Sequence, residues 1–310
     1  MGNKIVLITN RGIRPNRTGA TLFKNRMTKS DHRLRCAVID EGGNKDKYSL
    51  SLVAQGEEQT CLSQAIDDSN DKPWIFFVHG NNQTLKKNLK KCFALRDLYD
   101  VNVVAFSWPS VHHGHFMGTL GLIPYQPNPV KYLTRQLTRK LKQYGKARKN
   151  AELSAKDLSD SLALFKNALG GTEVKARFVC HSLGHRVLML SDQHRNLSES
   201  LEPFEHVLLH QADEDNEGHR DWVTAIGKGE KTVITTNEND TVLKISNLYN
   251  HKSLNNQRLG NVAKHDEHEP PTYKDFTGVK HVSLTGHTLF LTDSEDNPEV
   301  FNYFNSLIGE

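Results

Sequence analysis

Ser182 stands at the end of a short apolar run, within the sequence RFVCHSLGHRVL of residues 177–188. The run has the composition of a buried strand, and the residues from Gly184 onward have the pattern of a helix. A serine at such a strand-to-helix turn is lifted clear of the sheet, beside helix N-terminal amides that can bind an oxyanion. The segment therefore predicts a nucleophile elbow, with Ser182 as the nucleophile of a hydrolytic reaction.

This elbow departs from the usual G-x-S-x-G pattern at one position. Small residues two before and two after the serine let neighbouring backbone approach the tight turn. Gly184 occupies the second of these positions, whereas Cys180 occupies the first. Cysteine is small enough for the position but lacks the conformational freedom of glycine. An ordinary buried strand, followed by a helix that Ser182 merely caps, is therefore the alternative interpretation.

The serine needs a histidine base, and that histidine needs a carboxylate to fix its tautomer. The apolar run in residues 231–246 turns at Asp240, which supplies a carboxylate. Residues 279–290 are expected to form a last strand that ends beside His287. Strand ends at the carboxyl edge are where open α/β sheets carry their sites. The order Ser182, acid, base therefore favours Asp240 as the acid and His287 as the base.

The acid has a second candidate. Asp213 follows the apolar run at residues 206–212 and also lies at an expected strand end. A simple turn residue is the alternative role of Asp240, because aspartate is common in turns. The sequence favours Asp240 but leaves Asp213 open as the alternative acid.

The base competes with other histidines of the chain. His181 and His185 flank Ser182 in sequence, too closely to meet it from across the sheet, so we expect them to shape the pocket. His281 lies within the expected last strand, where a hydrogen-bonded structural role is favoured. His287 is therefore the preferred base.

An oxyanion hole needs one amide from the residue after the nucleophile and another from the loop after an earlier strand. Leu183 is the residue after the nucleophile. The sequence FFVHGNNQT at 76–84 ends an apolar run and then opens a helical pattern at Asn81 or Asn82, so either can supply the second amide. The residues expected to line the substrate pocket are His79, Gly80, His181 and Trp108.

Apolar runs that alternate with helical patterns must position these residues. Near-continuous apolar strands of this kind indicate a mostly parallel central sheet with helices on both faces, which is the α/β class. Residues 85–93 and 158–169 have their apolar positions on one helical face. No internal repeat or linker is visible, so a single domain over residues 1–310 is expected. The apolar runs are residues 5–9, 74–80, 101–108, 177–182, 206–213 and 231–238.

Residues 109–153 interrupt this alternation, and we expect them to form a basic, histidine-containing, cap-like insertion. Residues 130–149 have apolar positions at helical spacing and eight basic side chains with no acid among them. Such a helix has either a solvated basic face or a contact surface for an anionic substrate or a membrane. The formal charge of +4 is mild for this length and predicts no specific nucleic-acid partner.

The composition of the 310 residues, 36% hydrophobic and 25% charged, is that of a soluble globular protein. No apolar run approaches the roughly 20 residues that span a bilayer, and the N-terminal apolar stretch is too short for a secretory signal. A cytoplasmic protein without a cofactor is therefore expected. The four cysteines are scattered, which predicts reduced thiols and neither a disulfide framework nor a cysteine zinc site.

Seven motifs of the chain together resemble a bacterial α/β-hydrolase family of unknown function. The resemblance runs from Ile8 to about Phe304, and its most specific parts are the SWPS run and the HSLG elbow. It implies an α/β-hydrolase fold with Ser182 as nucleophile, Asp240 as acid and His287 as base. The motifs are ITNRG at 8–12, FVHGNN at 77–82, FSWPS at 106–110, CHSLGHRVL at 180–188, AD at 212–213, NDTVL at 239–243 and GHTLF at 286–290.

The chain departs from that family at Cys180, where the family usually has Ala or Gly, and in the insertion after Trp108. The expected function is that of an esterase-like or lipase-like serine hydrolase, which cleaves a carboxylic ester, or an amide or thioester, through an acyl-enzyme. The expected substrate is a small-molecule or lipid-like ester, and the basic helix favours an anionic one. Oligomeric state is not predicted.

Two other classes of function are weighed against this one. A metal-dependent hydrolase is less favoured, because HHGH at 112–115 and HDEH at 265–268 offer close ligands but do not match H-E-x-x-H. A binding or scaffold protein on the same fold is the other alternative, since a fold does not fix a function.

Overall fold

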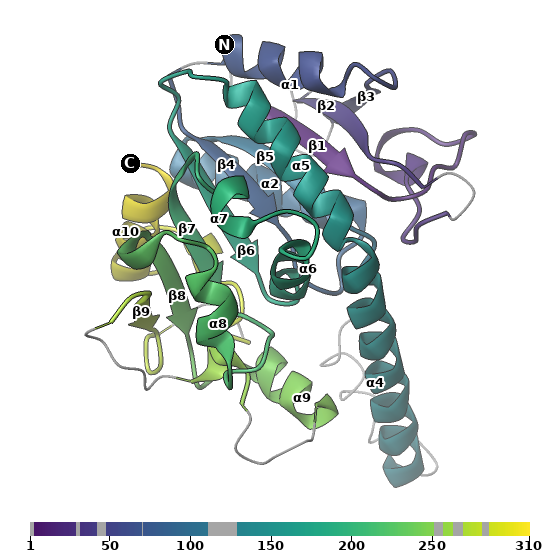
Figure 1. The fold of residues 1–310 in the computed structure, drawn as a ribbon. Coiled ribbons are helices and arrows are strands. Elements are labelled where there is room, and N and C mark those ends of the chain that lie inside the picture. The colour runs from purple at the N-terminus through teal and green to yellow at the C-terminus, as the bar shows by residue number, and fades with distance from the viewer. Residues whose placement is uncertain are drawn as a thin grey trace.

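The computed structural model describes residues 3–28, 32–41, 48–69, 71–110, 129–250, 257–262, 269–280 and 285–310. Within this part of the chain, nine strands form one central sheet in the order β3-β2-β1-β5-β4-β6-β7-β8-β9 (Figure 1). Neighbouring strands are parallel except where β2 pairs with β1 and β3. The strands are β1 (Ile5–Thr9), β2 (Arg35–Glu41), β3 (Tyr48–Leu52), β4 (Trp74–Val78), β5 (Asn102–Ser107), β6 (Ala176–His181), β7 (Phe204–His210), β8 (Thr232–Thr236) and β9 (Thr272–Asp275).

Alternate residues of the central strands face two hydrophobic layers. Val6 and Phe76 belong to one layer, whereas Ile5 and Phe77 belong to the other. Burial on both faces explains why β1, β4 and β5 read as continuous apolar runs. The first layer packs under α1 (Glu58–Asp67), α5 (Ala155–Leu169), α6 (Gly184–Ser191), α7 (Leu197–Ser200) and α8 (His219–Thr224), and the second under α2 (Leu85–Tyr99) and α10 (Pro298–Ile308).

Two further helices lie at the carboxyl end of the sheet. Helix α4 (Pro129–Leu153) continues into α5 and extends beyond the sheet, and α9 (Thr241–Tyr249) lies at the same end of the molecule (Figure 1). No helix in the described ranges is long and apolar enough to cross a membrane. Short 3-10 helices are formed by Gly19–Leu22, Gly229–Lys231, Leu259–Asn261 and Leu289–Leu291.

The predicted α/β class is confirmed, and each of the six apolar runs contains a strand of the sheet. The helical patterns at 85–93 and 158–169 lie in α2 and α5, and the basic pattern lies in α4. Of the expected insertion, residues 111–128 lie outside the described part of the chain.

The prediction of a last strand within residues 279–290 is wrong in the part of that run that the structure describes. Neither Val279 and Lys280 nor residues 285–290 form a strand. The sheet ends instead at β9, which pairs with β8, and Phe276 N–H still donates to Thr236 O. β9, at residues 272–275, therefore takes the last place in the sheet that the later run was expected to fill. His281 lies outside the described residues.

Candidate active site

Ser182 occupies the turn between β6 and α6, with a left-handed backbone (φ 55°). A residue with a side chain adopts this conformation only where its surroundings impose it. Three backbone hydrogen bonds do so here. Ser182 N–H donates to His210 O (3.1 Å), and Ser182 O accepts from the amides of His185 (3.1 Å) and Asp213 (3.3 Å).

Two glycines allow this turn to pack against the end of β4. A Cβ on Gly80 would lie 2.6 Å from Ser182 Cβ, and a Cβ on Gly184 would lie 2.9 Å from His79 O. The Gly184 position also approaches Cys180 Sγ, at 3.2 Å. Cys180 is fully buried, and burial raises the pKa of its thiol well above the usual value. The sulfur of Cys180 therefore fills space beneath the turn.

Asp240 and His287 are joined directly. Asp240 is fully buried, and its Oδ2 lies 2.5 Å from His287 Nδ1. Its other oxygen, Oδ1, accepts from the amides of Val242 (2.9 Å) and Leu243 (3.1 Å) and so caps the N-terminus of α9. A carboxylate at a helix N-terminus is stabilised by the helix dipole. This bond places the proton of His287 on Nδ1 and leaves Nε2 as an acceptor.

Side-chain amides hold the loop that carries His287. Gln211 Nε2 and Asn237 Nδ2 (3.2 Å) both donate to Gly286 O, and His181 Nε2 donates to His287 O (2.8 Å). Sequence reasoning missed Gln211 and Asn237, which lie within the predicted runs 206–213 and 231–238 and directly follow the observed strands β7 and β8. A polar residue at a strand end is the signal that could have drawn attention to them.

Ser182 follows a residue that contacts this pair, but it is not itself bonded to the pair in the described part of the chain. The ring of His181, next to Ser182 in the chain, lies 4.7 Å from the ring of His287. Among the described residues, no hydrogen bond involves Ser182 Oγ. Contacts between nucleophile and base are often long before substrate binds. The structure therefore brings the three predicted residues to one sheet edge and joins two of them.

The loop that follows β4 is fixed by Trp108 and Arg11. Trp108 Nε1 donates to His79 O (2.7 Å), and the two rings stack with centroids 5.3 Å apart. The buried Arg11 guanidinium donates to Trp108 O (2.5 Å) and Gln83 O (3.1 Å), and burial lowers its pKa to about 9. Arg11 belongs to the ITNRG motif but was not predicted to support the site.

The predicted amide donors lie on either side of the serine. Leu183 precedes α6, and its N–H donates to no acceptor in the described ranges. Gly80 contacts Ser182, and the next residues are Asn81 and Asn82, of which Asn82 has a left-handed φ of 59°. His79, His181 and Trp108, predicted to line the pocket, are buried beneath this edge.

Asp213, the alternative acid, makes no hydrogen bond to His287. Its Oδ2 accepts from Tyr144 Oη (2.9 Å), and its Oδ1 accepts from Ser246 Oγ and lies 3.6 Å from Arg258 Nε. Burial raises the pKa of Asp213. Both carboxylate oxygens are thus used to tie α4 and α9 to the strand end beside the nucleophile.

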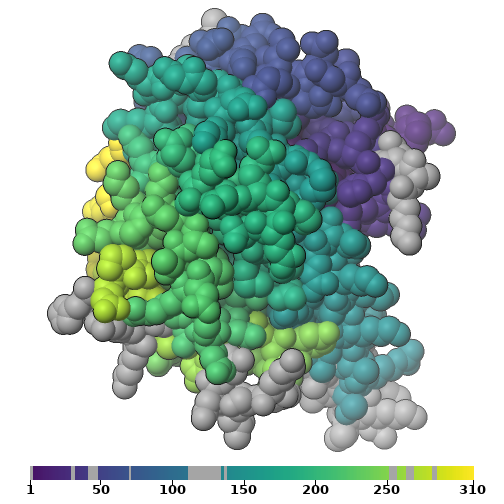
Figure 2. Space-filling view, in the orientation of Figure 1, coloured from purple at the N-terminus to yellow at the C-terminus, as the bar shows by residue number. Residues whose placement is uncertain are grey.

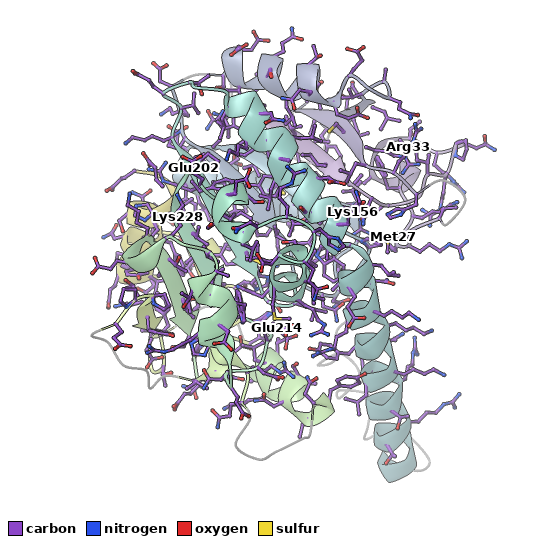
Figure 3. All side chains as sticks on the ribbon, viewed as in Figure 1. Met27, Arg33, Lys156, Glu202, Glu214 and Lys228 are labelled. Carbon is purple, nitrogen blue, oxygen red and sulfur yellow. The ribbon has the colours of Figure 1, made fainter. Side chains whose placement is uncertain are left out.

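Glu214 extends this connection to α6, beside which Figure 3 labels it. Its Oε2 lies 3.3 Å from Arg186 Nη1, and Arg186 also pairs with Glu152 of α4 (2.8 Å). Burial raises the pKa of Glu214 to about 7. Ion pairs therefore fasten α4 against α6.

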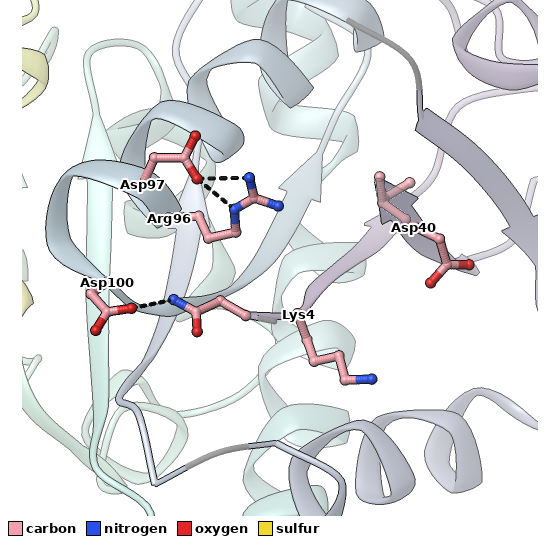
Figure 4. A pocket seen from close by; sticks show the side chains of 7 residues that line it. Lys4, Asp40, Arg96, Asp97 and Asp100 are labelled. Carbon is pink, nitrogen blue, oxygen red and sulfur yellow. Dashed lines mark hydrogen bonds and ion pairs between the residues drawn. The ribbon is translucent and has the colours of Figure 1, made fainter. Parts of the chain in front are cut away.

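An open surface pocket of about 680 Å³ lies at the opposite, amino-terminal edge of the sheet (Figure 4). Two of its three carboxylates are engaged locally: Asp97 with Arg96, and Asp100 with Asn3 and Lys72. It holds none of the predicted site residues. The pocket is lined by Asn3, Lys4, Ile39, Asp40, Arg96, Asp97 and Asp100.

No group of three or more His, Cys, Asp or Glu side chains that could hold a metal ion occurs among the residues that the structure describes. The two motifs on which the metal-dependent alternative rests, at 112–115 and 265–268, lie outside that part of the chain.

Comparison with known proteins gives one family. A family model described as an alpha/beta hydrolase of unknown function (DUF900) matches residues 54–303. No curated protein and no solved structure matches the chain significantly. The matched range includes Ser182, Asp240 and His287.

The buried His185 predicts a pH dependence of stability. Its Nδ1 donates to Ser182 O (2.7 Å), and burial lowers its pKa from 6.5 to about 4. In the unfolded chain His185 is protonated as the pH falls below about 6.5, whereas in the folded chain it stays neutral until about pH 4. The folded state therefore loses stability relative to the unfolded state as the pH falls below 6.5. We expect His185 to contribute a loss of about 2 kcal/mol in the free energy of unfolding between about pH 7 and 5.

Urea unfolding of His185→Asn at the two pH values measures this contribution. Asparagine retains a donor toward Ser182 O but does not titrate, so the variant should lose about 2 kcal/mol less than the wild type on acidification. His194→Asn, at an exposed position, is the matched control. Equal acid sensitivity of wild type and His185→Asn would contradict the prediction.

Proposed function

The chain belongs to this alpha/beta-hydrolase family of unknown function, and we propose that it is a serine hydrolase that cleaves a carboxylic ester. The observation that carries the proposal is the bond of 2.5 Å between Asp240 and His287, at the sheet edge where Ser182 occupies a strained turn. A buried acid, a base held in one tautomer and a serine next to them are the three parts of an acyl-transfer site.

In the proposed acylation step, Ser182 Oγ attacks the ester carbonyl carbon while His287 Nε2 takes the hydroxyl proton. The resulting imidazolium is stabilised by the Asp240 carboxylate, which stays ionised. Collapse of the tetrahedral intermediate breaks the bond to the alcohol oxygen, and His287 returns the proton to that oxygen. Water then attacks the acyl-enzyme by the same route and releases the acid.

The oxyanion of each tetrahedral intermediate needs donors that are already in place. We assign the first to Leu183 N–H, which has no acceptor among the described residues, at the positive end of α6. The second is assigned to the amide of Asn81 or Asn82, because Gly80 brings their loop against Ser182. Arg11 and Trp108 hold that loop, so its amides need not reorganise during reaction.

The proposal assigns the acid to Asp240 and a structural role to Asp213. Of these two aspartates, Asp240 is the one that hydrogen-bonds the imidazole of His287, and its second oxygen accepts hydrogen bonds from the first amides of α9. Asp213 has both oxygens occupied by hydroxyl donors and lies beside the Arg258 guanidinium. The backbone N–H of Asp213, and not its carboxylate, makes a hydrogen bond to Ser182 O.

The direct test of the nucleophile is labelling by a fluorophosphonate probe. We expect the folded wild type to be labelled at Ser182 and Ser182→Ala to remain unlabelled, because an activated serine reacts while an ordinary one does not. Peptide mass mapping identifies the modified residue. Folded wild type that stays unlabelled would overturn the proposal in favour of a non-catalytic protein.

A pair of variants separates the two candidate acids. Asp240→Asn keeps a good helix cap for α9 but removes the charge, so we expect the labelling rate to fall by roughly 10²–10⁴. Asp213→Asn is the matched control, with an expected change below about tenfold. Circular dichroism checks that both variants fold. The reverse ranking would assign the acid to Asp213.

A further inference from the structure

Five exposed basic side chains in the described part of α4 form one stripe along the helix. They recur at intervals of three or four residues, which places them on one side of a helix, and the stripe is about 21 Å long at 1.5 Å per residue. In the described part of the chain none of the five takes part in an ion pair. The stripe consists of Arg135, Arg139, Lys142, Lys146 and Lys149.

The opposite side of α4 packs against the protein. Ala147 and Ala151 are fully buried, and Tyr144 contacts α9 through the ring of Tyr249, 4.8 Å away. Arg148 donates to Asn250 at the end of α9 (2.9 Å). These contacts fix the rotation of α4 about its own axis, so the stripe points directly away from the body. Figure 2 shows the side chains of α4 standing out along the lower right border of the molecule.

The neighbouring helix exposes apolar side chains at the same end of the protein. Val242, Leu248 and Tyr249 of α9 are 38%, 47% and 37% exposed. They account for three of the five large hydrophobic side chains that are exposed in the described ranges, the others being Leu52 and Leu153. The exposed apolar side chains of α9 and the basic stripe of α4 thus lie at the same end of the protein, and apolar side chains that gather at one end are not expected of a simple solvated surface.

We propose that α4 and α9 form a docking surface for a bilayer that contains anionic phospholipids. The five cations match a layer of anionic headgroups, each adding to the attraction, and the exposed apolar residues of α9 suit the boundary between headgroups and acyl chains. Nucleic acid is less suited to the surface, because two of the three exposed apolar side chains of α9, Val242 and Leu248, are aliphatic and offer no ring on which a base could stack. Docking would bring the carboxyl edge of the sheet, where α9 begins at Asp240, toward the membrane.

Sedimentation of the full chain with phospholipid vesicles tests the proposal. We expect binding to phosphatidylcholine vesicles that contain about 30% phosphatidylserine, and little binding to phosphatidylcholine alone. The triple variant Arg135→Glu, Arg139→Glu and Lys142→Glu should bind the anionic vesicles at least about a hundredfold more weakly. The matched control reverses Arg17, Arg195 and Lys231, which are exposed elsewhere, and should bind within about threefold of the wild type.

The apolar part of the surface has its own pair of variants. Leu248→Ser should weaken binding to the anionic vesicles several-fold, whereas Leu52→Ser, on the outer strand β3, should leave it unchanged. Equal losses in the two triple variants, or binding to duplex DNA in place of vesicles, would overturn the proposal. Because sedimentation measures no chemistry, its failure would leave the serine-hydrolase proposal standing, and unlabelled Ser182 would leave the docking surface standing.

Discussion

The close approach of the β6–α6 turn to the end of β4 is the constraint on which the rest of the site depends. Neither Gly80 nor Gly184 has room for a side chain, because a Cβ would lie within 3 Å of neighbouring atoms. This contact places the loop after β4 alongside Ser182, whose left-handed backbone is held by its hydrogen bonds to His210, His185 and Asp213. The parallel pairing of β4 with β6 holds the two strand ends level, so the sheet itself maintains the contact.

Asp240 shows how one side chain can couple folding to the orientation of the His287 ring. One oxygen caps α9, and the other bonds the imidazole of His287. Formation of the first turn of α9 therefore fixes the carboxylate, and the carboxylate in turn fixes the ring. Gln211 and Asn237 act on the same loop from the other side, through the carbonyl of Gly286. The ring of His287 is thus held by Asp240, and its backbone is held through the neighbouring Gly286.

Sequence patterns could predict the strands that are buried on both faces, because a run such as β4 has no polar interruption. They did not predict β2, which includes Arg35, Asp40 and Glu41, or β3 and β9, which lie at the sheet edges and have only exposed and half-buried residues. Asp240 could be singled out because it closely follows the end of β8. His287 was expected after a strand that the described residues do not form, so the order of nucleophile, acid and base, and not a strand end, is what located it. The roles of Gln211 and Arg11 depend on carbonyls distant in sequence, and no local pattern reveals such partners.

The inner side of α4 contacts the rest of the protein, whereas its outer side presents the basic stripe. Tyr144 reaches inward to Asp213, whose backbone amide bonds Ser182, so the inner side belongs to the scaffold of the elbow. The cations of the outer side have no described partner that would bind them to that scaffold. A change of charge on the outer side therefore alters the long-range field of the protein but no contact of the elbow. Because α4 is anchored through Tyr144 and Arg148, a surface that attracts the stripe would orient the carboxyl edge of the sheet with it.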